Sequence, residues 1–250
     1  MILVVTGTST DVGKTVATAA LVARARARGA QRIAVVKPAQ TGVGPGAPGD
    51  LAQVRQLAGP VSTVECARYP EPLAPDVAAR RAGLPAVNRA RVTAAVAEAA
   101  TTHDVTIVEG AGGVLVRLAD VGGETGPLTV LDIAADVGAP IVVVCSPALG
   151  ALNHAELTVG AIRSRGLTPA GLIIGSWPTA PDLAMSCNAE DLPRVTGVPV
   201  IGTLPAGVGV LGHDEFVDRA PSWFDPDWTP SPVLSPIART IRRADKGVQP

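Results

Sequence analysis

The chain has 250 residues, of which 47% are hydrophobic, so it is long and apolar enough for one large α/β domain with a sizeable buried core. Its formal net charge is −1 and 17% of its residues are charged, which argues against a nucleic-acid groove or a polybasic membrane patch, because both need clustered Lys and Arg. We therefore expect a small-molecule ligand.

Six short apolar runs bounded by Gly and Pro predict buried strands, because they lack the polar alternation of a strand with one wet face. Alanine-rich stretches of helical character lie between several of them. This alternation predicts a doubly wound, mainly parallel sheet with helices on both faces. In chain order, the predicted strands are 2–6, 32–36, 105–109, 140–145, 170–175 and 199–204, and the helical stretches include 15–28, 88–101 and 153–165.

The first strand leads into a motif typical of phosphate binding. Gly13-Lys14-Thr15 opens a helix after a Gly-rich turn, so that backbone N–H groups face an anion, Lys14 reaches the outer phosphates and Thr15 ligates Mg²⁺. A plain strand-to-helix turn that carries a lysine is the alternative. The usual template has four residues between its first glycine and GKT, whereas five follow Gly7 here, so Thr8 takes the first-glycine position. This departure suggests a subfamily of nucleotide-binding loops.

The second strand leads into Lys37. Pro38 keeps this lysine extended, which aims its side chain beyond the sheet edge. Three of the 21 basic residues are lysines, so this choice of residue is unusual for the chain. Lys37 is therefore either a solvated surface lysine or a catalytic cation beside the loop PAQTG.

Two carboxylates are candidates for the oxygen ligands that magnesium needs beyond Thr15. Glu109 ends the third predicted strand and precedes GAGG, whose backbone can approach a ligand closely. The alternative for Glu109 is a solvated rim before a flexible turn. Asp50 starts a short predicted helix, where Asp is also an ordinary N-cap.

A turn and a helix follow the fourth predicted strand. Asn153 and Glu156 stand in capping-box spacing, which predicts that Asn153 caps this helix. The alternative is that free N–H groups at Gly150 to Asn153 hold a carboxylate of the substrate.

The rest of the sequence predicts two loops, the limits of the domain and the cellular compartment. Residues 38–49 and 119–128 are rich in Gly and Pro and predict loops over the carboxyl edge of the sheet, where ligands of such sheets bind. We expect residues 1–228 to form one domain and 229–250 a Pro-rich tail. The three cysteines are widely spaced, and neither a signal peptide nor a membrane span is recognisable, which favours a cytoplasmic protein.

Taken together and in this order, the motifs GTSTDVGKT, KPAQTG, GDLAQV, EGAGG and LGALNHAELT resemble dethiobiotin synthetase, over residues 2–228. The resemblance implies a P-loop NTPase-like fold and a homodimer with a shared active site. It also implies that Mg²⁺, CO₂ and ATP are used to close a cyclic urea on 7,8-diaminopelargonate. A carbamate on one amine would attack the γ-phosphorus, and the second amine would expel phosphate from the carbamic-phosphoric anhydride.

The resemblance also implies a role for each matching position. The triphosphate would be held by Asp11, Val12, Gly13, Lys14, Thr15 and Val16, and the nucleotide would also meet Gly110, Ala111 and Gly112. Magnesium would be held by Thr15, Asp50 and Glu109, while Lys14 and Lys37 offset developing charge. The diamine or its carbamate would contact Thr10, Lys37, Thr41 and Gly113, and the substrate carboxylate would lie at Gly150, Ala151, Leu152 and Asn153 of the neighbouring subunit.

One departure from this family concerns the base pocket. Many relatives carry an Asn-Asp pair where this chain has Gly175-Ser176-Trp177, so the amide that would pair with an adenine edge is missing. Another nucleoside triphosphate could therefore replace ATP. The walls of the base pocket would be Gly175, Ser176, Pro205, Ala206 and Gly207.

Other classes share parts of this pattern. A partitioning-type ATPase would carry a further lysine near the start of the loop, where this chain has Thr8 and Ser9, and a basic or amphipathic surface segment. A cobyrinate-type amide-forming synthetase would add a glutaminase domain with a catalytic Cys, for which the chain is too short. A small-molecule kinase is open on motif grounds alone.

Overall fold

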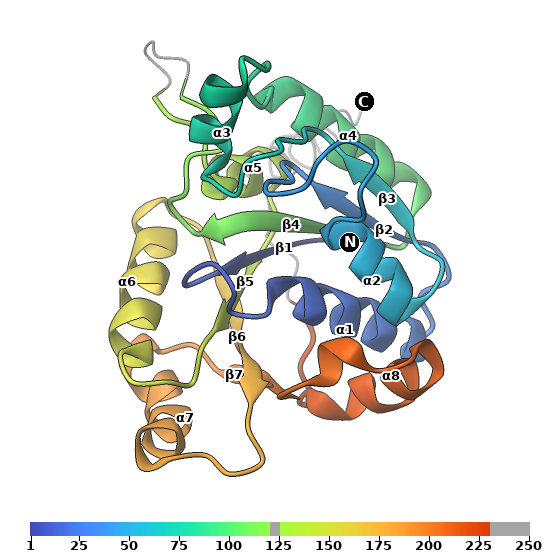
Figure 1. Cartoon of the computed structure of the whole chain (residues 1–250). Helices are drawn as coiled ribbons and strands as arrows, with labels where there is room; N and C mark the ends of the chain where they lie inside the picture. The colour runs from blue at the N-terminus through green and yellow to red at the C-terminus, as the bar shows by residue number, and fades with distance from the viewer. Residues whose placement is uncertain (121–125, 231–250) are drawn as a thin grey trace, which may run out of the picture.

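A seven-stranded parallel sheet organises the molecule (Figure 1). The structure, a computed structural model, describes residues 1–120 and 126–230, and within these ranges the strand order is β3-β2-β4-β1-β5-β6-β7. The strands are β1 (Ile2–Gly7), β2 (Ile33–Lys37), β3 (Ser62–Glu65), β4 (Val105–Gly113), β5 (Ile141–Cys145), β6 (Pro169–Trp177) and β7 (Val200–Pro205). The central strand β1 lies between β4 and β5, and the predicted phosphate-binding turn follows its carboxyl end.

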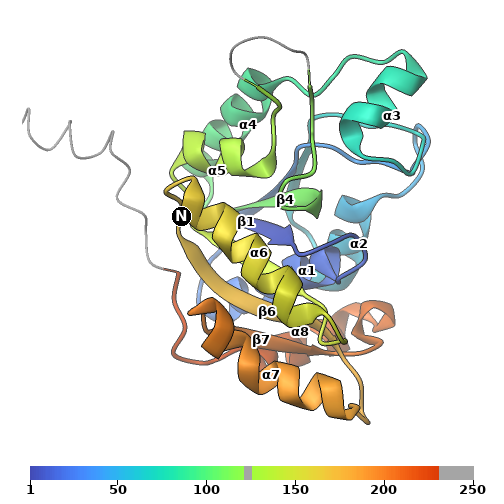
Figure 2. The ribbon, with the colours of Figure 1, turned by 90° about the vertical axis from the view of Figure 1, so that its left-hand side faces the viewer.

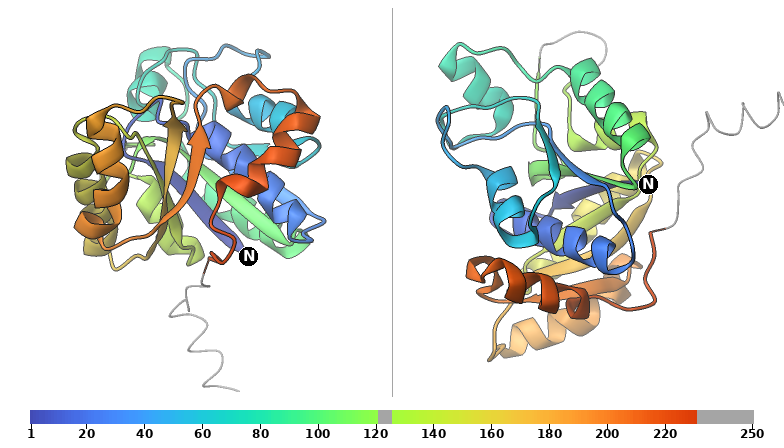
Figure 3. Two further views of the ribbon diagram at one scale, coloured as in Figure 1. Left: turned by 90° about the horizontal axis from the view of Figure 1, so that it is seen from below. Right: turned by 90° about the vertical axis from the view of Figure 1, so that its right-hand side faces the viewer.

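Helices cover both faces of this sheet, as Figures 2 and 3 show. Helices α1 and α2 pack on one face together with the C-terminal elements, and α3 to α7 pack on the other. The helices are α1 (Lys14–Ala27), α2 (Asp50–Ala58), α3 (Pro75–Ala82), α4 (Arg89–Thr102), α5 (Val130–Val137), α6 (Ala151–Ser164), α7 (Leu183–Thr196) and α8 (His213–Arg219), with short 3₁₀ helices at Val208–Val210 and Ala220–Trp223.

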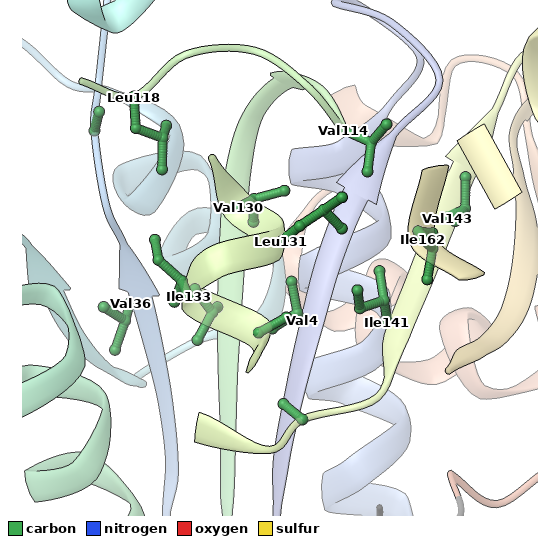
Figure 4. Packing of buried hydrophobic residues seen from close by; sticks show 14 of the residues in the cluster. Val4, Val36, Val114, Leu118, Val130, Leu131, Ile133, Ile141, Val143 and Ile162 are labelled. Atoms are coloured by element: carbon green, nitrogen blue, oxygen red, sulfur yellow. The ribbon is translucent and has the colours of Figure 1, made fainter. Parts of the chain in front are cut away.

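The two hydrophobic layers follow from the alternation of side chains along each strand. In β1, Leu3 and Val5 face the layer of α1, whereas Val4 faces the opposite layer. Figure 4 shows Val4 packed among residues of α5 and the neighbouring strands. Because both faces are buried, the central strands need continuous apolar sequence, which is the pattern that predicted them.

The predicted fold class is confirmed, and every predicted strand is present. The prediction omits β3, because this short edge strand alternates between exposed and half-buried residues and carries no continuous apolar run. The strand predicted to end at Glu109 continues to Gly113, so the GAGG segment is part of β4 and is not a flexible turn.

Two predicted segments fall partly beyond the described residues. Residues 121–125 of the loop predicted at 119–128, and residues 231–250 of the predicted tail, lie outside the described residues. At the ends of that loop, Ala119 and Leu128 form an antiparallel bridge.

A buried arginine ties the C-terminal segment to α1, the helix that follows the phosphate-binding turn. Arg24 donates to the carbonyl oxygens of Asp225 and Trp228 at 2.8 and 2.7 Å. Its guanidinium carbon also lies 5.5 Å from the ring centroid of Phe224 and 5.0 Å from that of Trp228. Charge-assisted hydrogen bonds and cation–π contacts of this kind both gain strength from burial.

We expect Arg24→Met to lower the free energy of unfolding by about 2 kcal/mol, because the variant loses both kinds of contact while keeping an apolar stem. Urea titration monitored by tryptophan fluorescence measures this difference. Arg55→Met is the matched control, since Arg55 is an exposed arginine of α2, and its effect should stay within about 0.5 kcal/mol. Equal destabilisation by the two substitutions would contradict this account of the Arg24 contacts.

Candidate active site

The phosphate-binding turn connects β1 to α1 and has a tightly curled backbone. Asp11 has a φ of 57°, and Gly13, the N-cap of α1, has a φ of 91°. Left-handed residues of this kind curve the chain so that successive N–H groups can face a common anion. The Nζ of Lys14 donates to the carbonyl oxygen of Ser9 at 2.8 Å, so the lysine lies across the turn.

The electrostatic surroundings of Lys14 suit a site for anions. Burial lowers the pKa of Lys14 to about 8, with a further lowering by the charge of Lys37 and an opposing effect of Glu109 and Asp50. A negatively charged ligand beside Lys14 would favour its ammonium form and so reverse this shift.

The end of β6 holds the turn in place through a contact between two glycines. A Cβ on Gly13 would lie 2.7 Å from the carbonyl oxygen of Gly175, and a Cβ on Gly175 would lie 1.9 Å from the carbonyl oxygen of Val12. Real Cβ atoms do not approach backbone oxygen so closely. Glycine at both positions therefore sets how near the turn can lie to β6.

Lys37, Asp50 and Glu109 form a charge cluster next to the turn. The Nζ of Lys37 lies 2.5 Å from Oδ2 of Asp50 and 2.7 Å from Oε1 of Glu109. It also donates to the carbonyl oxygen of Gly110 at 3.1 Å. The hydroxyl of Thr15 donates to the same Oε1 of Glu109 at 3.0 Å, so α1, β2, α2 and β4 meet at one point.

Burial decides between the alternatives for these residues. Lys37 is 2% exposed and Glu109 is 0% exposed, so neither is a solvated surface residue. Burial alone would lower the pKa of Lys37, but Glu109 and Asp50 outweigh it and raise the pKa, so the side chain is an ammonium ion. The N-cap of α2 is Gly49, and Asp50 is the first helical residue, so the capping interpretation of Asp50 is wrong.

A cavity of about 920 Å³ opens over this cluster and the turn. Its walls include many of the predicted site residues, and Gln40, Gln53 and the segment 72–75 were not predicted to take part. Gln53 follows Asp50 by one helical turn, which is a signal that sequence reasoning could have used. The predicted residues that line the cavity are Thr10, Asp11, Gly13, Lys14, Thr15, Val16, Lys37, Thr41, Asp50, Ala111 and Gly112.

The fold has counterparts among solved structures. MinD of Aquifex aeolicus is 17% identical with a TM-score of 0.51, covering 100% of this chain and 98% of that one. The ParA family ATPase of Chlorobium tepidum TLS is 14% identical with a TM-score of 0.51, covering 88% and 96%. At this identity the likeness concerns the fold alone. A family model described as an AAA domain matches residues 2–209.

Curated relatives are far more similar in sequence. The ATP-dependent dethiobiotin synthetase BioD of Rhodococcus jostii (strain RHA1) is 56% identical over 230 residues, which is 92% of this chain and 97% of that protein. The protein of the same name from Streptomyces coelicolor is 52% identical over 225 residues, 90% of this chain and 92% of that one. The chain belongs to the dethiobiotin synthetase family. The motif set therefore identifies the family correctly, and the partitioning-type and cobyrinate-type alternatives are not favoured.

In this member of the dethiobiotin synthetase family, α6 begins earlier than its sequence predicts. The N-cap is Gly150, with a φ of 93° and no side-chain hydrogen bond, and the helix starts at Ala151. Asn153 is an exposed residue inside the first turn, so the capping-box prediction is wrong. A left-handed glycine starts this helix without any side-chain cap. None of the residues Gly150 to Asn153 lines the cavity of the described chain.

The ends of β6 and β7 lie beside each other where the base pocket is predicted. The N–H of Ala206 donates to the carbonyl oxygen of Trp177 at 2.7 Å, and Gly207 turns the chain with a φ of 81°. Gly175 and Ser176 stand at the same end of β6, and Pro205 ends β7. These residues, like Val12, Gly110 and Gly113, do not line the cavity over the charge cluster.

The donor set suits a hard divalent cation that is completed by phosphate oxygens. The Oε2 atom of Glu109 is buried, with no hydrogen-bond partner in residues 1–120 and 126–230. No three His, Cys, Asp or Glu side chains of these ranges are grouped to hold a metal by themselves. Magnesium commonly combines one or two carboxylates with substrate phosphates, so Thr15, Asp50 and Glu109 fit it.

Proposed function

We propose that the chain catalyses the dethiobiotin synthetase reaction, in which 7,8-diaminopelargonate, CO₂ and a nucleoside triphosphate, ATP in the first place, give dethiobiotin, the diphosphate and phosphate. One observation carries the proposal. Lys14, Lys37 and Asp50 line one cavity, and Lys37 is ion-paired with Asp50 and with the buried Glu109, in a chain 56% identical to a curated ATP-dependent dethiobiotin synthetase. The MinD and ParA likeness concerns the fold alone and supports no other activity.

The chain's own groups fit the charges that this reaction develops. One amine of the substrate adds CO₂, and an oxygen of the resulting carbamate attacks the γ-phosphorus, with release of the nucleoside diphosphate. The second amine then closes the ring and expels phosphate. Lys14 and Lys37 would stabilise negative charge on the carbamate and on the transferring phosphoryl group, and their positions beside the turn and the charge cluster support these roles. Magnesium, when bound, would neutralise charge on the phosphate oxygens.

Two groups of residues around the cluster receive binding roles in this proposal. The turn from Asp11 to Val16 would hold the triphosphate, as its curled backbone suggests. Thr10, Thr41 and the backbone of Gly112 and Gly113 would contact the diamine or its carbamate. The placement of Thr10, Thr41 and Gly112 around the cavity supports this assignment.

The limits and the setting of the enzyme are also proposals. We assign the reaction to residues 1–228 as one domain. None of the helices in residues 1–120 and 126–230 is both long and apolar enough to span a bilayer. Cys66, Cys145 and Cys187 are unpaired among the described cysteines, and burial raises the pKa of Cys145 to about 12. Unpaired thiols fit the reducing cytoplasm that we propose for this protein.

An omission assay tests the proposed function. Purified protein is incubated with diaminopelargonate, bicarbonate and MgATP, and each component is left out in turn while phosphate and dethiobiotin are measured. We expect phosphate release to need both the diamine and the CO₂ source. Release that is indifferent to them, or stimulated by DNA, would refute the proposal and favour a partitioning-type ATPase.

We expect weak discrimination between nucleotide bases, because Gly175 and Ser176 offer no amide side chain to an adenine edge. Discrimination by hydrogen bonds can reach about 10⁴-fold when a site provides them. Here the values of kcat/KM for ATP, CTP and GTP should differ by less than about tenfold. The three values are measured under identical magnesium concentrations, and a strong preference for ATP alone would contradict this prediction.

We further propose a homodimer in which Gly150 to Asn153 of one subunit bind the substrate carboxylate at the other subunit's cavity. The absence of these residues from the cavity of the described chain supports this arrangement, as does the position of Gly150 at a helix N-terminus. Leu149 is 88% exposed and Leu157 is 65% exposed, which suits a surface that a second copy covers.

Mixing two inactive variants tests the shared site. Lys37→Ala disables the charge cluster, and Asn153→Asp places a negative charge against the substrate carboxylate. Random exchange of subunits leaves one intact site in each mixed dimer, so co-refolded variants should recover about a quarter of wild-type activity. Each variant refolded alone is the control. A mixture that stays as inactive as its components, although light scattering shows dimers, would contradict the shared site.

A further inference from the structure

Gln40 is a buried amide between the second strand and α2, and its backbone is fixed on both sides. It is 4% exposed. Its N–H donates to the carbonyl oxygen of Ala67 at 2.9 Å, and its carbonyl oxygen accepts from the N–H of Tyr69 at 2.8 Å. These bonds extend the pairing of β2 and β3 beyond their ends. The position of Gln40 is therefore set by the edge of the sheet.

The side chain of Gln40 satisfies backbone groups of two predicted site residues. Its Oε1 accepts from the N–H of Asp50 at 2.8 Å, and its Nε2 donates to the carbonyl oxygen of Thr41 at 3.1 Å. The N–H of Asp50 belongs to the first turn of α2, where N–H groups lack partners within the helix. Gln40 supplies an acceptor for this N–H from outside the helix.

A side chain at Gly49 would crowd this contact for steric reasons alone. A Cβ at Gly49 would lie 2.5 Å from Oε1 of Gln40, closer than real Cβ contacts. Its φ of −113° is open to any residue, so backbone conformation does not require glycine there. Asp50 itself is one-third exposed, and its carboxylate reaches Lys37 at 2.5 Å. The helix start and the ion pair with Lys37, and not burial, hold this carboxylate in place.

We infer that Gln40 is a positioning residue for the reaction: its amide fixes the start of α2 and the loop with Thr41, so that the Asp50 carboxylate faces the magnesium and phosphate region. The inference rests on the proposed function and deepens it. It assigns to the Gln40 side chain the placement of a proposed magnesium ligand, Asp50, and of the loop that carries Thr41. Mutation of a residue that hydrogen-bonds to a metal ligand commonly lowers metal affinity or activity by about 10- to 100-fold.

Two independent substitutions disturb the same contact. Gln40→Ala removes the amide, and Gly49→Ala pushes it away from the N–H of Asp50. Gly44→Ala is the matched control, because Gly44 lies in the same loop, a Cβ there meets no atom within 4 Å, and its φ is not positive. Circular dichroism and thermal melts establish that each variant is folded.

Calorimetry measures nucleotide affinity with magnesium and with EDTA. In magnesium, we expect Gln40→Ala and Gly49→Ala to bind the nucleotide about tenfold more weakly, while affinity in EDTA changes less than about twofold. Hydrogen exchange should also become faster at the amide of Asp50. Gly44→Ala should match the wild type in both measurements. Equal losses with and without magnesium would indicate a merely structural role and overturn the inference, as would wild-type behaviour of both variants.

The outcome can be separated from failure of the proposed function. If phosphate release by the wild-type protein does not depend on the diamine and CO₂, the proposed function fails. The comparison of nucleotide affinity in magnesium and in EDTA still decides the role of Gln40. If the wild type turns over normally, we expect kcat/KM to fall about 10- to 100-fold in both variants and not in the control.

Discussion

Replacing Lys37 by alanine is expected to lower kcat by about 100-fold or more while nucleotide affinity stays within a few-fold of wild type. The reason is that the Lys37 ammonium lies against Asp50 and Glu109 at 2.5 and 2.7 Å, beside the phosphate-binding turn but not within it. In the proposed reaction Lys37 would stabilise charge that develops during phosphoryl transfer, whereas Lys14, which lies across the turn, would still hold the ground-state triphosphate. Rapid-quench turnover and calorimetric titration measure the two quantities.

The same substitution should also destabilise the protein. Glu109 is fully buried, and removal of one partner of a buried ion pair typically costs about 3–5 kcal/mol. Adding Glu109→Gln to Lys37→Ala removes the uncompensated charge, so the double variant should regain part of the stability. It should regain none of the turnover. If the double variant recovered turnover as well, Lys37 would act only by compensating the buried charge of Glu109, and no role in the reaction would remain for either side chain.

The sequence predicts the fold well where one strong physical requirement controls it. Central strands buried on both faces need continuous apolar runs, and each such run became a strand. The edge strand β3 escapes prediction because its burial alternates and its partner lies on one side. The start of α6 is mispredicted because a glycine backbone conformation, which leaves no polar side chain to recognise, decides it.

The site shows the same division. Lys14, Lys37 and Glu109 could be brought together from sequence, because parallel strands end at the same edge of a sheet. The bridging of Asp50 and Glu109 by Lys37 depends on where α2 lies after a long loop, which local sequence does not determine. Gln40 is likewise an inconspicuous residue until the fold places its amide between Thr41 and Asp50.

Substitution of Gly175 by alanine is expected to weaken nucleotide binding and to lower kcat/KM by about 100-fold, because misplacement of a group by about an ångström can cost that much in rate. The new Cβ would lie 1.9 Å from the carbonyl oxygen of Val12 and 2.8 Å from a methyl group of the Val144 side chain, which leaves little room to relax. The φ of Gly175 is not in the left-handed region, so the effect comes from this contact. Overpacking should also cost about 1–3 kcal/mol of unfolding free energy.

Gly171→Ala on the same strand is the matched control, because its Cβ would lie 2.5 Å from the side chain of Ile201, away from the turn. Both variants should lose stability, but we expect weaker nucleotide binding in Gly175→Ala alone, as measured by calorimetry. Equal nucleotide affinities of the Gly175→Ala and Gly171→Ala variants would contradict the account in which β6 positions the turn. The contact also bears on base recognition: a side chain at residue 175 is incompatible with the turn at its present distance. The close packing of the phosphate-binding turn on β6 is thus matched by a glycine, which has no side chain to offer a base, at this position.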